Sequence, residues 1–205
     1  MAKQKEINRK FKTVFFDYDG TLFDTTEAEK FSVRDKGLRR FSPEWVQARK
    51  VYLAHIRESK PYEGWQEVFE FIVENNIQAA IVSGNGSLVL NISVKQNNLK
   101  SVFPKAKINR IGGISKKDGN PTLFEHALKI LGEDPQNVIA FGNQLCDAQA
   151  ADNAGIQAVH CIWGAKAEER EQMLTDKNHQ CITSPHQIIA ILRSETNSQI
   201  HATKF

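Results

Sequence analysis

The sequence predicts an α/β fold built on a doubly wound parallel sheet. Short apolar runs alternate with amphipathic segments along most of the chain. The apolar runs are continuous rather than alternating in polarity, which is typical of strands that are buried on both faces of a sheet. Repeated strand–helix units need right-handed crossovers, and these make successive strands parallel. We therefore expect a Rossmann-like core.

Each predicted strand ends in residues that suit a turn or a binding site. The first run leads directly into Asp17, and the second leads into Ser83. Ligands of doubly wound sheets bind at the carboxyl ends of the strands, so these residues become candidates for function. The predicted strands are 13–16, 79–82, 107–111, 138–141 and 158–162, with a short edge strand at 181–182.

Helical patterns separate the strands. In the segment 65–74, Trp65, Val68 and Ile72 share one face. The segment 121–131 begins with Pro-Thr and ends before Gly132, which are start and stop signals of a helix. The predicted helices are 65–74, 87–97, 121–131, 144–153, 165–174 and 185–193.

One stretch interrupts the alternation of strands and helices. It contains two predicted helices, 27–40 and 43–57, and no convincing strand. We therefore expect an α/β core at 11–24 and 61–193, a small helical cap inserted at 25–60, and polar tails at 1–10 and 194–205. The insertion carries about +4, although the whole chain carries only +3.

The composition excludes several classes of protein. The 205 residues are 40% hydrophobic and 25% charged, which argues against a disordered or collagen-like chain. The net charge of +3 is too small to indicate a nucleic-acid partner. Three cysteines without CxxC spacing argue against a disulfide framework and a zinc site. Because no segment resembles a bilayer span or a secretory leader, we expect no membrane partner and a cytoplasmic location.

The strongest chemical signal follows the first predicted strand. It reads Asp17-Tyr18-Asp19-Gly20-Thr21-Leu22. Two carboxylates two residues apart at a strand exit can face the same crevice. A carboxylate can attack phosphorus to form an aspartyl phosphate, and an oxygen-ligated cation such as Mg²⁺ is expected beside it. The motif therefore points to phosphoryl transfer.

Three further motifs follow in order near strand ends. They are Ser83-Gly84-Asn85-Gly86, then Lys116-Lys117 before a helix, then Gly142-Asn143-Gln144-Leu145-Cys146-Asp147. With these four motifs, the predicted core resembles the haloacid dehalogenase superfamily of phosphohydrolases. The resemblance implies that Asp17 is the nucleophile and a metal ligand. It also implies that Asp19 is the general acid and base, with its main-chain carbonyl on the metal, and that the substrate is a phosphate ester.

The phosphate-binding residues follow from the second and third motifs. A hydroxyl beside free N–H groups at a helix N-terminus can seat a phosphate, and the resemblance gives this role to Ser83, helped by the amides of Gly84 and Asn85. A lysine near the nucleophile would neutralise phosphate charge. The family pattern favours Lys117 for this role, with Lys116 as the alternative.

The fourth motif departs from the family pattern Gly-Asp-x-x-x-Asp. Asp147 matches the second acid, whereas Asn143 replaces the first, which is commonly a metal ligand. An amide oxygen can coordinate Mg²⁺ but brings no charge. The resemblance therefore implies a weakened Mg²⁺ site formed by Asp17, Asp19, Asn143 and Asp147.

These motifs together predict a Mg²⁺-dependent phosphatase that hydrolyses a small phosphate monoester through an aspartyl-phosphate intermediate. Two alternatives remain open. One is a sugar-phosphate mutase, which shares the core, and the other is a non-catalytic binding or regulatory module, suggested by Asn143. The basic insertion points to a further anionic group on the substrate or to electrostatic steering. The physiological substrate and the oligomeric state do not follow from the sequence.

Overall fold

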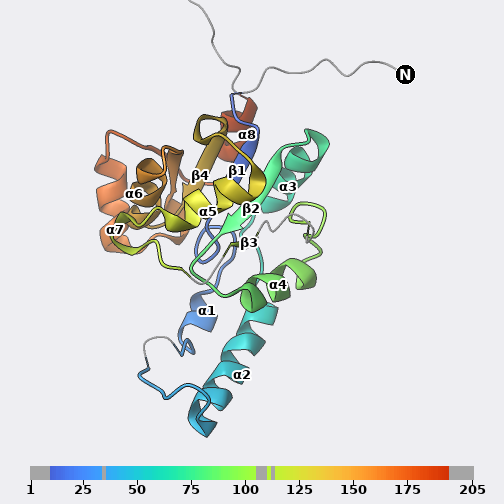
Figure 1. Cartoon of the computed structure of the whole chain (residues 1–205), viewed down its shortest axis with the longest axis vertical. Helices are drawn as coiled ribbons and strands as arrows, with labels where there is room; N and C mark the ends of the chain where they lie inside the picture. Colours follow the sequence, from blue (N-terminus) through green and yellow to red (C-terminus); the bar gives the residue numbers. More distant parts are fainter. Residues whose placement is uncertain (1–9, 34–35, 105–109, 112–113, 194–205) are drawn as a thin grey trace, which may run out of the picture.

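The computed structural model describes residues 10–33, 36–104, 110–111 and 114–193 (Figure 1). Its centre is a parallel six-stranded sheet with the order β3-β2-β1-β4-β5-β6. This confirms the predicted doubly wound sheet, including the edge strand near residue 181. The predicted residues 107–109 of the third strand lie outside the described residues. The strands are β1 (Thr13–Phe16), β2 (Gln78–Val82), β3 (Arg110–Ile111), β4 (Val138–Gly142), β5 (Gln157–Cys161) and β6 (Gln180–Ile182).

Both faces of the sheet are covered by helices, which explains the continuous apolar strands. Along β1, Val14 and Phe16 belong to one core and Phe15 belongs to the other. The first core includes residues of α3 (Trp65–Glu74), α4 (Ser87–Gln96) and α8 (His186–Arg193). The second core includes residues of α5 (Thr122–Leu131) and α6 (Leu145–Asn153), and α7 (Ala167–Thr175) precedes the edge strand β6.

The strand order places a topological switch beside β1. The chain runs from β1 through β2 to β3 on one side, and then returns to β4, β5 and β6 on the other. Such a switch opens a crevice at the carboxyl ends of the two strands that flank it, here β1 and β4. The candidate motifs that follow these strands therefore meet in space.

The insertion is less helical than its sequence predicts. The expected helix 27–40 is wrong, because α1 spans only Thr26–Glu29. Within α1 only Ala28 is buried, so little apolar burial supports a longer helix, and Phe41 adopts a positive φ of 68°, which is not helical. The second expected helix is present as α2 (Pro43–Glu58), which is capped by the hydroxyl of Ser42 and has proline at its first turn.

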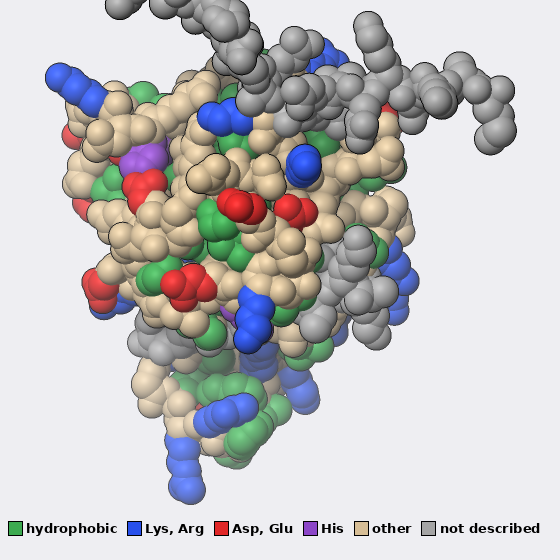
Figure 2. Space-filling model, turned by 45° about the horizontal axis from the view of Figure 1, so that its top comes forward, with side chains coloured by type: hydrophobic (Ala, Val, Ile, Leu, Met, Phe, Trp, Pro, Cys, Tyr) green, Lys and Arg blue, Asp and Glu red, His purple; other side chains and the backbone are tan. Residues whose placement is uncertain are grey.

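The insertion projects beyond the carboxyl ends of the strands (Figure 1). Its helix α2 packs against α1 and α4. Lys and Arg side chains spread over this end of the molecule in Figure 2. Arg34, one of the basic residues of the insertion, lies outside the described residues. Among the described helices, none is both long and apolar enough to cross a bilayer.

Candidate active site

The loop after β1 turns both motif carboxylates toward one cavity. The Asp17 amide donates to the carbonyl of Phe141 in β4 at 2.9 Å, which continues the strand pairing as far as Asp17. Gly20 has a φ of +72°, a conformation that a side chain would strain. The loop then reverses, and Asp17 and Asp19 line a cavity of about 560 Å³.

Two tryptophans anchor this loop from opposite parts of the sequence. The indole N–H of Trp65 and that of Trp163 each donate to the carbonyl oxygen of Thr21 at 3.0 Å. Both rings also lie in van der Waals proximity, with centroids 6.4 Å apart. The positions of the two carboxylates are therefore tied to α3 and to the turn after β5.

The second motif lies beside Asp19. Ser83 and Gly84 line the cavity at the end of β2. The Asn85 amide donates to Ser83 Oγ at 3.1 Å, and the Asn85 side chain donates to Asp19 Oδ2 at 2.5 Å. The Tyr52 hydroxyl of α2 reaches Asn85 Oδ1 at 3.4 Å. The side chain of Asn85 thus connects the insertion to Asp19, a role that the sequence did not indicate.

The structure places Lys116, rather than Lys117, against Asp17. Lys116 Nζ lies 2.6 Å from Asp17 Oδ1 and 2.5 Å from Asp147 Oδ1, and it also donates to the carbonyl of Val82. Lys117 is exposed at the rim of the same cavity. A tight turn at Lys117–Gly119, with Asp118 at a φ of 57°, follows Lys116, and the lysine before this turn points inward.

Burial sets the electrostatics of this cluster. Burial raises the pKa of Asp17 to about 7, although Lys116 acts in the opposite direction, and the charges of Asp147 and Asp19 raise it further. Burial alone would lower the pKa of Lys116, but Asp147 and Asp17 outweigh it and hold this pKa above its ordinary value. The lysine therefore stays a cation between two carboxyl groups.

Asn143 serves as a clamp on the loop of the first motif. Its Oδ1 accepts from the Thr21 hydroxyl at 2.9 Å, and its Nδ2 donates to the carbonyl of Gly164 at 2.9 Å. The packing is tight, because a Cβ at Gly164 would lie 1.9 Å from the carbonyl oxygen of Gly20. Asn143 and Asp147 are both buried, but only Asp147 lines the cavity.

The cavity offers oxygen atoms that suit Mg²⁺, namely the carboxylates of Asp17 and Asp147 together with the predicted main-chain carbonyl of Asp19. Asp17, Asp19 and Asp147 all line the cavity, and oxygen atoms are the ligands that this hard cation prefers. Asp147 Oδ2 also accepts from the Gln144 amide at 3.0 Å, which fixes its orientation at the start of α6. The predicted fourth ligand, Asn143, is not among the residues that line the cavity, and its side chain bonds Thr21 and Gly164 instead.

Replacing Asn143 separates its clamp role from a metal role. We expect Asn143→Asp to lower the free energy of unfolding by about 1–3 kcal/mol, because a carboxylate oxygen would face the Gly164 carbonyl without a hydrogen atom between them. Urea denaturation measures this loss, with the exposed Asn98→Asp as a control. A lower Mg²⁺ requirement in a phosphate-release assay, without loss of stability, would instead return Asn143 to the ligand set.

Sequence reasoning missed the contributions of Trp163 and Gly164. Both follow β5, and their position at a strand's carboxyl end was the one available signal. Cys146 also lines the cavity, where burial raises the pKa of its thiol to about 11. This thiol is therefore protonated at neutral pH and is a poor nucleophile.

Comparisons with known proteins find a matching family model and a related phosphatase. The family model described as haloacid dehalogenase-like hydrolase matches residues 28–161, a segment that begins after Asp17 and Asp19. A phosphoglycolate phosphatase of Aquifex aeolicus (strain VF5) is 24% identical over 186 residues, which cover 75% of this chain and 85% of that protein.

Solved structures share the fold at low sequence identity. A putative phosphatase from Clostridium difficile has a TM-score of 0.69 at 19% identity, covering 89% of this chain and 99% of its own. CbbY from Rhodobacter sphaeroides in complex with phosphate has a TM-score of 0.68 at 16% identity, with coverages of 89% and 99%. These likenesses show the architecture of the core.

Proposed function

Because the chain belongs to the haloacid dehalogenase-like hydrolases, we propose that it is a Mg²⁺-dependent phosphatase that hydrolyses a small phosphate monoester through an aspartyl phosphate. Its predicted enzyme class, a phosphoric monoester hydrolase of this family, is confirmed. The observation that carries the finer proposal is the convergence of Asp17, Asp19, Ser83 and Lys116 on one cavity.

The hydrogen bonds support different roles for the two oxygens of Asp17, the proposed nucleophile. Lys116 holds Asp17 Oδ1, and among the described residues Asp17 Oδ2 accepts no hydrogen bond, so Oδ2 is the atom that attacks phosphorus. The bond from phosphorus to the leaving oxygen breaks as Asp19 donates a proton to that oxygen. Asp19 then takes a proton from water, whose oxygen displaces Asp17 from phosphorus and releases phosphate.

The remaining groups position the phosphoryl group and neutralise its charge. Lys116 is a buried cation beside the attacking carboxylate, and Ser83 offers a hydroxyl at the end of β2. Asn85 orients Asp19 through its hydrogen bond to Oδ2. Mg²⁺, held by Asp17, Asp19 and Asp147, would supply further neutralisation of the phosphoryl charge.

The substrate class is supported by the relative and by charge. The name of the Aquifex aeolicus protein gives phosphoglycolate as its substrate, a small monoester with a second anionic group. In this chain the insertion, whose Tyr52 contacts Asn85 beside Asp19, carries about +4, whereas the whole chain carries +3. We therefore favour a small monoester with a further negative group.

The proposal is tested by a phosphate-release screen with and without Mg²⁺. The substrates are phosphoglycolate, sugar phosphates and nucleotides, and the Asp17→Asn variant is the blank. We expect Mg²⁺-dependent release that exceeds the blank for small monoesters. Activity equal to the blank at saturating Mg²⁺ would indicate the non-catalytic alternative, and a requirement for a bisphosphorylated sugar would indicate a mutase.

Arg49 is the arginine of the insertion with the clearest connection to the site. Its guanidinium carbon lies 5.2 Å from the ring centroid of Tyr52, whose hydroxyl contacts Asn85. We expect Arg49→Gln to raise KM roughly 2–5-fold for an anionic substrate at low salt, with kcat little changed. Arg57→Gln is the matched control, because Arg57 is exposed and bonds the carbonyl of Leu53. Equal KM values for both variants would contradict this role, as would an effect that persists in high salt.

A further inference from the structure

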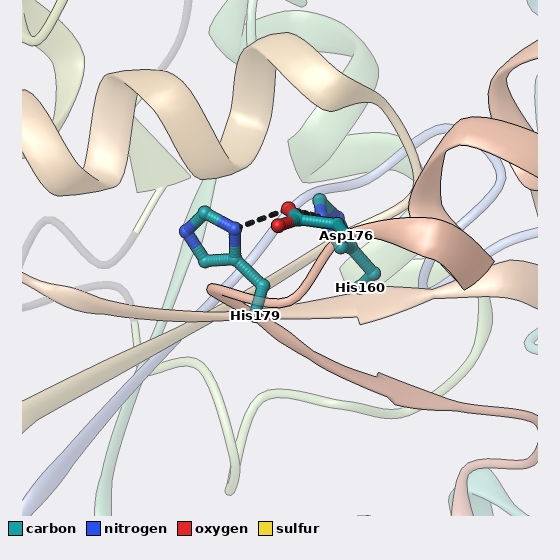
Figure 3. Close-up of side chains that lie close together, drawn as sticks. All are labelled: His160, Asp176 and His179. Carbon is teal, nitrogen blue, oxygen red and sulfur yellow. Dashed lines mark hydrogen bonds and ion pairs between the residues drawn. The ribbon is translucent and has the colours of Figure 1, made fainter.

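A second cluster of metal-ligating side chains lies outside the cavity, at the edge of the sheet formed by β6. His160 lies in β5, Asp176 follows α7, and His179 precedes β6. Figure 3 shows the carboxylate of Asp176 between the two imidazole rings. His160 is 1% exposed. In the sheet it lies opposite Gly142 of β4 and Cys181 of β6.

The ligand atoms of this cluster lie close together, with both ring nitrogens against the same carboxylate oxygen. Asp176 Oδ2 lies 3.1 Å from His160 Nε2 and 2.6 Å from His179 Nδ1. One ligand atom from each residue lies within 4.8 Å of the others. In a tetrahedral Zn²⁺ site with bonds of 2.0–2.1 Å, ligand atoms lie about 3.3 Å apart. The three side chains therefore need only a small separation to admit an ion.

The surroundings orient one ring for this purpose. His179 Nε2 lies 2.8 Å from Asp152 Oδ2 of α6, so that a carboxylate holds the nitrogen opposite to the one that faces Asp176. Metal-bound histidines commonly have such a carboxylate on their second nitrogen, because it fixes the ring and its tautomer.

Hydrogen bonding alone leaves the cluster incompletely satisfied. Nδ1 of His160 is buried and has no hydrogen-bond partner within the part of the chain that the structure describes. Buried polar atoms of this kind are uncommon and call for an explanation. Nε2, not Nδ1, faces Asp176, so an ion held at Nε2 would leave Nδ1 as it is, and the proximity of Nε2, Asp176 Oδ2 and His179 Nδ1 is the observation that points to an ion.

We propose that His160, Asp176 and His179 bind a Zn²⁺-like transition-metal ion. Two imidazole nitrogens and one carboxylate suit Zn²⁺, Co²⁺ or Ni²⁺, whereas Mg²⁺ prefers the oxygen-only set of the cavity. Asp176 and His179 have side chains that are 19% and 11% exposed, so water can complete the coordination. The ion would join β5 to the segment that leads into β6, a strand of three residues that pairs with β5.

The proposal is tested on the full chain in excess Mg²⁺, which occupies the carboxylate cavity. Co²⁺ is the probe, because its visible absorption reports nitrogen ligands, and Zn²⁺ is the competitor. We expect the chain to bind one equivalent of Co²⁺, and we expect Zn²⁺ to displace it. We also expect a hundredfold excess of Zn²⁺ over its Kd to raise the melting temperature by roughly 5–10 °C.

Variants decide whether this cluster is the site. His179→Gln should weaken Co²⁺ binding at least 100-fold, and Asp152→Asn should weaken it about 10–100-fold by removing the orienting carboxylate. His126→Gln, at an exposed position of α5, is the matched control and should bind as the parent chain does. Circular dichroism verifies that each variant is folded.

Two results would overturn the proposal. One is the absence of a Co²⁺ spectrum in the parent chain, and the other is equal Co²⁺ affinity in the parent chain and in folded His179→Gln or Asp152→Asn. Because the readouts are spectra and melting temperatures, neither result depends on the proposed phosphatase activity. If His179→Gln does not fold, the partial loss expected for Asp152→Asn still decides the question.

Discussion

Lys116→Met is expected to reduce kcat for phosphate release by about 10²–10³-fold, because it removes the buried cation beside Asp17, the proposed nucleophile. The exposed neighbour provides a matched control, since Lys117→Met changes the same charge one residue away. We expect this control to keep kcat within about threefold of the parent chain. Phosphate release under saturating Mg²⁺ and substrate measures both variants.

The same substitution is expected to destabilise the fold. Lys116 lies between Asp17 and Asp147, and all three side chains are buried. Removal of one partner from a buried ion pair typically costs about 3–5 kcal/mol, because the remaining charge loses its compensation. Urea denaturation in the absence of divalent metal should show this loss for Lys116→Met and a change below about 0.5 kcal/mol for Lys117→Met.

The two lysine variants can also contradict the assignment. A larger loss of activity in Lys117→Met than in Lys116→Met would return the phosphate-binding role to Lys117. If Lys116→Met is too unstable to assay, Lys116→Arg keeps the charge on a larger group. We expect that variant to fold and to lose activity, because a guanidinium does not fit between the two carboxylates.

Asp17→Asn is expected to abolish phosphate release, with a loss of at least about 10³-fold, because the amide is not a nucleophile toward phosphorus. At the same time it should stabilise the metal-free protein by on the order of 1 kcal/mol, or about 2–4 °C in melting temperature. Burial already disfavours the Asp17 carboxylate, and Asp147 remains to pair with Lys116. Activity and stability should therefore change in opposite directions.

The stability gain should depend on pH in a defined direction. The pKa of Asp17 is raised from 3.8 to about 7 in the folded state, so between these values the folded state binds more protons than the unfolded state. The contribution of Asp17 to stability is therefore present below pH 4 and is lost as the pH rises toward 7. Asp17→Asn should remove this slope from a metal-free melting profile.

The metal provides the control for this experiment. Mg²⁺ should raise the melting temperature of the parent chain more than that of Asp17→Asn, since a ligand that binds only the folded state stabilises it. A metal-free Asp17→Asn protein that is less stable than the parent chain at pH 8 would contradict this account. So would an unchanged dependence of the melting temperature on pH.

The regular elements of the core were predictable because local patterns decide them. The run Val14 to Phe16 is apolar at every position, and it is a central strand with helices on both faces. In α5, the apolar stripe and Gly132 define the helix and its end, where Gly132 adopts a φ of 68°. The predicted helix 27–40 was wrong. Only Thr26–Glu29 is helical there, and within it only Ala28 is buried, so little apolar burial supports a longer helix.

The candidate site was likewise only partly predictable from the sequence. Asp17, Asp19, Ser83 and Asp147 follow from strand ends and short motifs, and the structure brings all four to one cavity. The sequence favoured Lys117, whereas Lys116 faces inward, because two adjacent lysines differ only in the turn that follows them. The hydrogen bonds of Asn143 were not accessible, because both of its partners belong to other segments of the chain.

The sequence by itself determined the parallel α/β core, the order of the motifs and the family to which the chain belongs. Only the tertiary structure decided that Lys116 lies between Asp17 and Asp147, and that Asn143 bonds the loop of Thr21 to Gly164. It also brought His160, Asp176 and His179 together. The physical reason is that strands and helices follow from neighbouring residues, whereas the partner of a buried polar group is selected by the packing of distant segments.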